Sequence, residues 1–236
     1  MLRNYLKKKK LNDMYWTDEG YLLSKNNFSE NSIIIEAFTL KHGKYTGIVY
    51  GGSSRKQKRN FQIGNKILFN WNSKGENKTG YFTIELIKPI SPLFFDDKKR
   101  STCIFSIASI LKILLPERQT NKKIYASLEN MLIELQSENW INWYIFWELA
   151  LIKELGFEVN FLNVLKTDSK IIKSININNK SFKIPKILYQ SNTRKLQKHE
   201  IKEALIFNKN LLIENFILPN KLKFPLYRNI LENYFT

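Results

Sequence analysis

Five short runs of apolar and β-branched residues follow one another in the first third of the chain, separated by polar turn segments. In the last run Phe82, Ile84 and Leu86 alternate with Thr83 and Glu85, which is the period of a half-buried strand. Strand-forming residues dominate each run, whereas Gly, Asn, Ser and Lys fill the segments between the runs. The pattern predicts five β-strands, at residues 15–23, 32–40, 45–52, 65–73 and 79–87.

Five strands in so short a stretch favour a small closed barrel over an open sheet, because closure removes exposed strand edges. Gly47, Gly51 and Gly52 are expected where such a barrel needs bulges or sharp bends. We therefore expect a barrel domain over residues 14–90. Residues 1–13 contain a basic cluster without periodicity, and we interpret them either as an N-terminal arm or as an extension upstream of a start at Met14.

After Pro89 and Pro92 the hydrophobic period changes from that of strands to that of helices. Helices are predicted at residues 100–115, 124–136, 140–156, 199–217 and 222–233. The chain is thus predicted to be a multi-domain α+β protein, with an all-helical domain over residues 91–236 and a weakly patterned insertion near residues 157–190. A stripe of aromatic side chains at helical spacing is expected to be core rather than a ligand site; it consists of Trp140, Trp143, Tyr144 and Trp147.

The charge balance points to polyanionic partners. The chain carries 38 Lys and Arg against 21 Asp and Glu, a net charge of +17, which attracts nucleic acid or an anionic membrane. Compositional drift is the alternative explanation, because Lys, Asn and Ile are the residues that AT-rich codons favour. No apolar stretch reaches the length of a membrane span, and we expect a soluble, cytoplasmic protein.

Candidate catalytic and metal-binding groupings are weak. A single cysteine, Cys103, and two distant histidines provide no zinc-ligand spacing. The adjacent acidic pairs Asp18-Glu19 and Asp96-Asp97 are interpreted as structural, since magnesium sites draw carboxylates from separate, converging elements. Nucleotide-binding and nucleophile motifs are absent as well. We expect no metal, no cofactor and no enzymatic activity.

The basic residues are more informative. Arg55, Lys56, Lys58 and Arg59 cluster in one turn-rich connection after the third strand, and Lys41 and Lys44 lie in the preceding loop. Loops of this kind can border a groove of the barrel that combines charge for phosphates with aromatic rings for bases. We predict that these six residues contact DNA together with Trp71. Tyr50 and Phe69 are further aromatic candidates, although Trp71 and Phe69 also suit the barrel core. Arg118, Lys122 and Lys123 are candidates for binding an acidic peptide or are surface charge.

Several features occur together in the order and spacing of a known family. They are Asp18-Glu19-Gly20, Thr39 before His42-Gly43, Gly51-Gly52-Ser53 followed by basic residues, Gly64, Trp71, the segment LLPERQ at residues 114–119, and WYIFWELALIKELGFEVN at residues 143–160. Over this stretch the chain resembles the bacterial recombination mediator family RecO. It lacks the cysteine-based zinc module of many members, because residues 161–190 contain no cysteine.

The resemblance implies an OB-fold N-terminal domain and a helical C-terminal domain. It also implies sequence-independent binding of single- and double-stranded DNA, annealing of complementary strands, and cooperation with RecR in loading RecA onto DNA coated by single-strand binding protein. The helical domain is implied to hold the acidic C-terminal tail of that protein, in a bacterial, nucleoid-associated setting. The alternatives are an adaptor that binds only proteins and an OB-containing enzyme acting on nucleic acid.

Overall fold

The computed structural model describes residues 14–52, 61–75, 79–157, 174–189 and 196–235. The predicted arm at residues 1–13 lies outside these ranges. The chain divides into two compact units, residues 1–125 and 126–236, and each is described by itself. Strands give way to helices between residues 89 and 97, and the first unit continues to Tyr125. The domain ranges expected above therefore stay a prediction.

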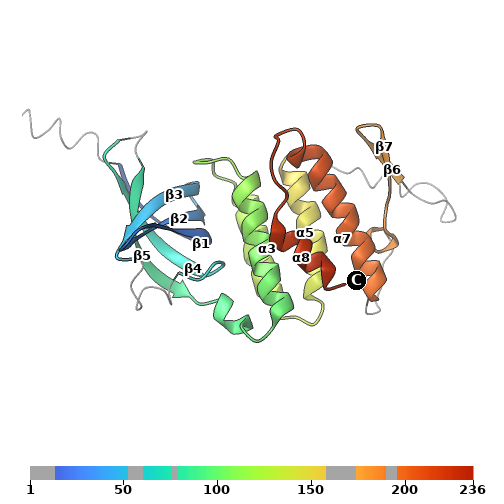
Figure 1. Cartoon of the computed structure of the whole chain (residues 1–236), viewed down its shortest axis with the longest axis horizontal. Helices are drawn as coiled ribbons and strands as arrows, with labels where there is room; N and C mark the ends of the chain where they lie inside the picture. The colour runs from blue at the N-terminus through green and yellow to red at the C-terminus, as the bar shows by residue number, and fades with distance from the viewer. Residues whose placement is uncertain (1–13, 53–60, 76–78, 158–173, 190–195, 236) are drawn as a thin grey trace, which may run out of the picture. The chain divides into compact units, whose positions relative to one another are not determined.

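Five strands of the first unit close into a barrel in the order β1-β2-β3-β5-β4 (Figure 1). Neighbouring strands are antiparallel except β3 and β5, which run parallel. This closed, five-stranded arrangement confirms the predicted OB-type barrel. The strands are β1 (Met14–Ser29), β2 (Ser32–Thr39), β3 (Gly43–Tyr50), β4 (Lys66–Ser73) and β5 (Gly80–Lys88).

The barrel interior is built from alternate residues of each strand. In β4, Ile67, Phe69 and Trp71 are at most 1% exposed and point inward, as the period of a strand requires. They pack with inward residues of the other strands in one core, which includes Trp16, Leu22, Ile35, Tyr45, Val49 and Phe82. The alternation read from the last strand is confirmed, because Phe82 is 2% exposed in this core and Ile84 and Leu86 pack against it while partly buried.

Strand β1 continues past Leu23, where the sequence pattern predicted its end. Lys25, Asn26 and Asn27 pair with Ile35, Ile34 and Ile33 of β2, and the register is irregular before Ser24 and after Asn27. Polar residues with turn propensity thus remain in the ladder because the apolar partner strand supplies the pairing. Only two residues are left for the turn between β1 and β2.

Barrel closure depends on two facing glycines in the parallel pair. Gly47 of β3 lies opposite Gly80 of β5. A Cβ atom on Gly47 would approach the Phe82 ring to 2.6 Å, and one on Gly80 would approach the Trp71 ring to 2.3 Å. Gly47 therefore permits close approach of the interior rings and does not mark a bulge, whereas Gly51 has the positive φ of +71° expected at a turn.

The first unit also contains η1 (Ser91–Phe94) and helix α3 (Lys98–Leu114). Asp97 caps α3, because its side chain accepts hydrogen bonds from the backbone nitrogens of Lys99 and Arg100. Helix α4 (Lys122–Glu134) begins in this unit, where Tyr125 packs against Tyr21 and Phe38.

The second unit holds α5 (Trp140–Glu154), α7 (Lys198–Leu212), the π-helical turn η3 (Ile213–Ile217) and α8 (Leu226–Asn233). Helices α5 and α7 pack against each other, as do α7 and α8 (Figure 1). The aromatic stripe on α5 is core at Trp140, Tyr144 and Trp147, as expected. Trp143 is the exception, because it is 49% exposed.

A short hairpin adds strands to the part of the chain predicted to be entirely helical. It consists of β6 (Ser174–Ile177) and β7 (Lys180–Lys183), and η2 (Lys186–Leu188) follows it. Asn178 and Asn179 adopt positive φ angles of 50° and 63° in its two-residue turn, a conformation that asparagine tolerates. Among the described residues, no helix is long and apolar enough to cross a membrane.

Candidate nucleic-acid interface

The four basic residues at the centre of the predicted DNA site, Arg55, Lys56, Lys58 and Arg59, lie outside the described residues. The described chain ends before them at Gly52 and resumes after them at Phe61. The surroundings of these two residues therefore define where the basic segment joins the barrel.

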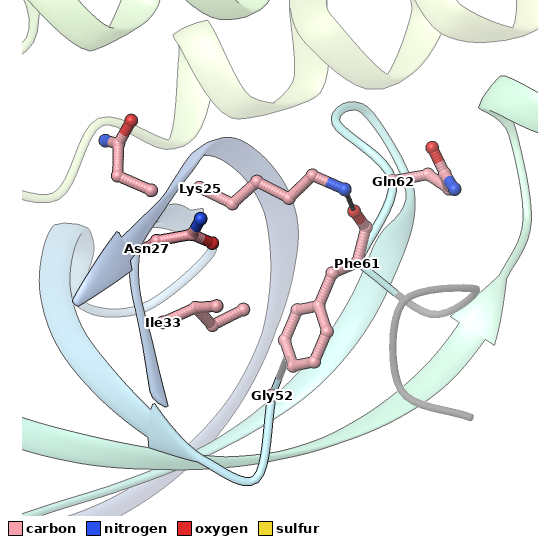
Figure 2. A pocket seen from close by; sticks show the side chains of 7 residues that line it. Lys25, Asn27, Ile33, Gly52, Phe61 and Gln62 are labelled. Carbon is pink, nitrogen blue, oxygen red and sulfur yellow. Dashed lines mark hydrogen bonds between the residues drawn. The ribbon is translucent and has the colours of Figure 1, made fainter. Parts of the chain in front are cut away.

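A pocket of about 540 Å³ lies at this junction (Figure 2). Its lining consists of Lys25, Asn26, Asn27, Ile33, Gly52, Phe61 and Gln62. The Lys25 ammonium donates a hydrogen bond to the Phe61 carbonyl oxygen at 2.5 Å and so fixes one wall. The side-chain amides of Asn26, Asn27 and Gln62, which can donate and accept hydrogen bonds, thus line the pocket together with the Lys25 ammonium. This combination suits a phosphate or a base edge.

Lys41 and Lys44, which were predicted to act together, have different environments. Lys41 is exposed. Lys44 is only 8% exposed, and its ammonium donates a hydrogen bond to the Lys112 carbonyl oxygen at 2.7 Å. Lys112 belongs to the last turn of α3, where a cation is favourable. The burial of Lys44 therefore contradicts its predicted contact with DNA, whereas the contact of Lys41 with DNA stays a prediction.

Trp71 is a core residue in the structure. It is 1% exposed, and its ring centroid lies 5.7 Å from that of Trp16 and 5.2 Å from that of Tyr45. Phe69 is fully buried beside it. A ring inside the barrel offers no face to a base, so the prediction that Trp71 contacts DNA is wrong for this conformation.

Asp18 has a structural role that explains two sequence features at once. Its Oδ2 atom accepts hydrogen bonds from the Lys41 backbone nitrogen at 2.6 Å and from His42 Nδ1 at 3.1 Å. The His42 ring in turn stacks on Trp16, with centroids 4.2 Å apart and an angle of 7° between the planes. The buried carboxylate thus fixes the loop between β2 and β3 to the first strand.

Each acidic pair thus contributes a carboxylate to a local structural contact. Asp18 holds the loop between β2 and β3, and Asp97 caps α3 and forms an ion pair with Arg100. Within the described ranges, no group of three or more His, Cys, Asp or Glu side chains is arranged to hold a metal ion.

Arg118, Lys122 and Lys123 are exposed and lie in the first unit. The Arg118 guanidinium lies 5.5 Å from the centroid of the Tyr45 ring, and the Arg118 backbone nitrogen donates to the Lys44 carbonyl oxygen at 2.8 Å. Lys122 and Lys123 occupy the first turn of α4, the end of a helix where anions are favoured. The three side chains are thus accessible to a partner.

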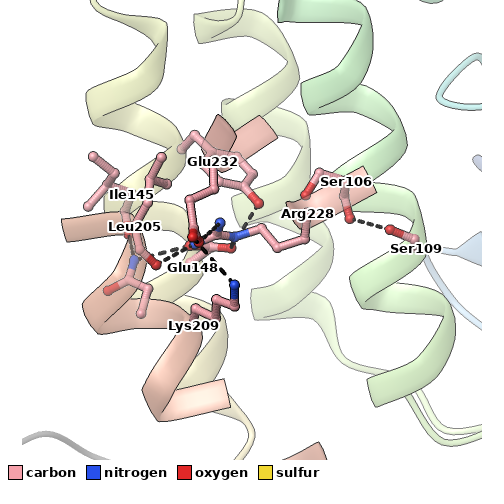
Figure 3. A network of polar contacts seen from close by, with 10 residues as sticks. Ser106, Ser109, Ile145, Glu148, Leu205, Lys209, Arg228 and Glu232 are labelled. Atoms are coloured by element: carbon pink, nitrogen blue, oxygen red, sulfur yellow. Dashed lines mark hydrogen bonds and ion pairs between the residues drawn. The ribbon is translucent and has the colours of Figure 1, made fainter. Parts of the chain in front are cut away.

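A buried ionic network holds the second unit together (Figure 3). Arg228 of α8 is fully buried and bonds through Nε to Glu148 of α5 at 2.5 Å, and it also donates to the Leu205 carbonyl oxygen of α7. Burial alone would lower the pKa of Arg228, but the charge and hydrogen bonds of Glu148, with Tyr144 and Glu232, raise this pKa above its ordinary value. Because no atom of the pair reaches solvent, its function is structural.

Two family sequence models match the chain. The one described as "Recombination protein O N terminal" matches residues 14–90, which contain the whole barrel. The one described as "Recombination protein O C terminal" matches residues 96–207. The chain belongs to the recombination protein O family.

Curated members of this family show the same relationship. The chain is 32% identical over 157 residues to the DNA repair protein RecO of Cereibacter sphaeroides, and the alignment covers 66% of this chain and 65% of that protein. It is 33% identical over 144 residues to the DNA repair protein RecO of Jannaschia sp., and this alignment covers 61% of this chain and 59% of that protein. The identity to the DNA repair protein RecO of Wolbachia pipientis is 31% over 159 residues, and the alignment covers 66% of this chain and 65% of that protein. The chain thus matches slightly less than two thirds of the length of these relatives.

The structure explains several of the residues through which the chain resembles the RecO family. Asp18 and His42 fasten one loop of the barrel, and Glu148 neutralises the buried Arg228. Sequence reasoning included Glu148 in the family-like segment at residues 143–160 but assigned it no partner. A charged residue inside a helix that is otherwise apolar on nearly every side is the signal that could have revealed its buried partner.

Proposed function

We propose that this protein is a DNA-binding recombination mediator in DNA repair, without catalytic activity of its own. The observation that carries the proposal is the match of both family models in order, with the N-terminal model covering the five-stranded barrel. In this proposal the barrel binds single- and double-stranded DNA without sequence preference and brings complementary strands together.

The proposed mechanism is electrostatic. Annealing joins two polyanions that repel each other, and a cationic protein reduces this repulsion by neutralising phosphates and releasing counterions. Residues 1–13 carry a net charge of +4, residues 14–90 of +5 and residues 91–236 of +8. Positive charge is therefore available on more than one segment, as binding of two strands requires.

The proposed partners follow from membership of the RecO family. They are RecR, RecA as the protein that is loaded, and the acidic tail of single-strand binding protein. Arg118, Lys122 and Lys123 are the proposed contacts for that tail because they are exposed and basic. The proposed setting is the bacterial cytoplasm at the nucleoid, and no cofactor is required.

Filter binding with bare single-stranded DNA tests the central claim. Between 50 and 200 mM salt we expect the affinity for single strands to fall by roughly three-hundredfold if about six phosphates are contacted. Similar affinities are expected for oligonucleotides of unrelated sequence. An affinity that stays flat with salt would contradict the proposal and favour an adaptor that binds only proteins.

A strand-annealing assay tests the function itself. Two complementary strands are mixed with and without single-strand binding protein, and duplex formation is followed over time. We expect faster annealing when the protein is present, also on coated strands. Metal-dependent cleavage of either strand in the same assay would instead indicate an enzyme.

A further inference from the structure

Three exposed tyrosines lie on the outer surface of the barrel. Tyr15 of β1 is 64% exposed, Tyr50 of β3 is 68% exposed and Tyr81 of β5 is 38% exposed. The other rings considered above for DNA contact, those of Trp71 and Phe69, are inside the barrel. We call Tyr15, Tyr50 and Tyr81 the tyrosine surface.

Strand register places the three rings on the same face of the sheet. Asn72 of β4 is opposite Tyr15 on one side and opposite Tyr81 on the other, and side chains of directly opposed residues share a face. Tyr81 is also opposite Ile48 in β3, two residues before Tyr50. All three tyrosines therefore project outward near the same end of the barrel.

The rings are neighbours and are held in place. The centroids of Tyr50 and Tyr81 are 6.1 Å apart, with an angle of 53° between the ring planes. Tyr15 lies two strand spacings from Tyr81, about 10 Å. Its hydroxyl is within hydrogen-bond distance of Thr17 Oγ1 at 3.0 Å and of Asn70 Oδ1 at 3.3 Å. The ring faces are thus ordered without being covered by these contacts.

The surroundings of the tyrosine surface favour an anionic ligand. Lys74 follows β4 two residues after Asn72 and is exposed. In the described strand register, the outward residues beside the rings are neutral and mostly short: Thr17, Ile48, Asn70, Asn72 and Thr83. At the described strand positions no carboxylate lies between the rings, and an exposed cation follows β4, which matches the arrangement that binds bases and phosphates together.

We propose that Tyr50 and Tyr81, with Tyr15 beside them, form a platform on which bases of single-stranded DNA stack, while Lys74 contacts the backbone. This inference deepens the proposed function and rests on it. Double-stranded DNA does not use the platform, because stacking of neighbouring base pairs within the duplex hides the faces of its bases. The tyrosines therefore distinguish single strands from duplexes, whereas the positive charge attracts both.

The test compares two double variants that differ only in whether a ring is present. The Tyr50→Leu/Tyr81→Leu variant keeps apolar side chains but removes stacking, and Tyr50→Phe/Tyr81→Phe keeps both rings. Affinities are measured for a thymidine oligonucleotide, for an abasic strand of the same length and for a duplex. We expect the Leu variant to bind the thymidine strand roughly tenfold or more weakly. The Phe variant is expected to stay within about twofold of the unchanged protein.

The other two ligands and one further variant are controls. Abasic strand and duplex should bind all three proteins equally, because neither presents a base to stack. Tyr227→Leu alters a tyrosine of the second unit that is 42% exposed, and it should leave every affinity unchanged. Thermal unfolding of each variant identifies any loss of fold, since exposed cross-strand pairs also stabilise a sheet modestly.

The outcomes separate the platform from the proposed function. If the Leu variant binds the thymidine strand as well as the unchanged protein does, the platform is wrong and DNA binding stands. If the unchanged protein binds no DNA, the proposed function itself is wrong. Should the Leu variant fail to fold, photo-cross-linking of a 5-iododeoxyuridine oligonucleotide to the unchanged protein decides: cross-links at Tyr50 or Tyr81 support the platform, and cross-links confined to other residues overturn it.

Discussion

At the scale of single residues, the most consequential contact is the buried pair of Arg228 and Glu148. Both side chains are 0% exposed, and Asn208 and Tyr144 also donate hydrogen bonds to the Glu148 carboxylate. Removing two charges from water costs several kcal/mol per ion, and only close contact and complete hydrogen bonding offset that cost. The pair therefore joins three helices only as long as both partners are present.

Replacing Arg228 by Met should strongly destabilise the second unit. The Glu148 carboxylate would stay buried without its cation, and we expect the free energy of unfolding to fall by about 3–5 kcal/mol. The measurement is urea unfolding followed by tryptophan fluorescence. Lys209→Ala is the matched control, because the ion pair of Lys209 with Glu232 is partly exposed and longer, at 3.4 Å; its loss should cost less than about 1 kcal/mol. Equal losses in the two variants would contradict this assignment.

At the scale of elements, the start of α3 shows how one carboxylate sets a helix boundary. Asp97 accepts hydrogen bonds from the backbone nitrogens of Lys99 and Arg100, each at 3.0 Å. Burial alone would raise the pKa of Asp97, but the hydrogen bonds and charge of Arg100, with the Lys99 backbone, lower it below its ordinary value of 3.8. The ionised form therefore stabilises the folded state.

The cap predicts a specific dependence on pH. Asp97→Ala should reduce the free energy of unfolding by about 1 kcal/mol at neutral pH, whereas Asp97→Asn keeps an oxygen acceptor and should lose less. Because the pKa of the folded state is depressed, the stabilisation is present above the ordinary pKa and disappears as the pH falls through the folded value. The difference between the unchanged protein and Asp97→Asn should thus shrink between about pH 5 and pH 2. Urea titrations at each pH measure the free energy of unfolding of both proteins. A difference that does not change with pH would exclude a stabilising role for the ionised Asp97 carboxylate.

At the scale of the whole molecule, positive charge is unevenly divided. The first unit holds 23 Lys and Arg and 10 Asp and Glu, a net charge of +13, whereas the second unit has a net charge of +4. Uniform drift in composition would give two units of similar length similar charges. The asymmetry instead supports a polyanion-binding role for the unit that contains the barrel.

The location of the charge is testable with two variants of equal charge. Replacing Arg55, Lys56, Lys58 and Arg59 by Ala should weaken DNA binding and make its dependence on salt shallower, since fewer counterions are released. Replacing Lys183, Lys186, Lys198 and Lys223 of the second unit, all exposed, removes the same charge and is the control. Filter binding over a salt series compares the slopes. If both variants behaved alike, net charge alone would matter and the basic segment would lose its assigned role.

Much of the architecture could be predicted because local patterns determine it. Alternation in β4 and helical spacing in α5 each follow from the requirement to bury one face. The prediction was less successful at the candidate site. Whether an aromatic residue such as Trp71 or Tyr81 faces inward depends on register, and whether Lys44 reaches solvent depends on a helix 68 residues away in the sequence.

The sequence by itself determined a strand-rich segment followed by helices, a strong positive charge and the resemblance to the RecO family, because periodicity, composition and motif order are properties of the chain. Only the tertiary structure decided that Trp71 and Lys44 are buried, that Arg228 neutralises Glu148, and that three tyrosines from separate strands share one face. The physical reason is that burial and pairing are set by segments distant in sequence, which barrel closure and helix packing bring together.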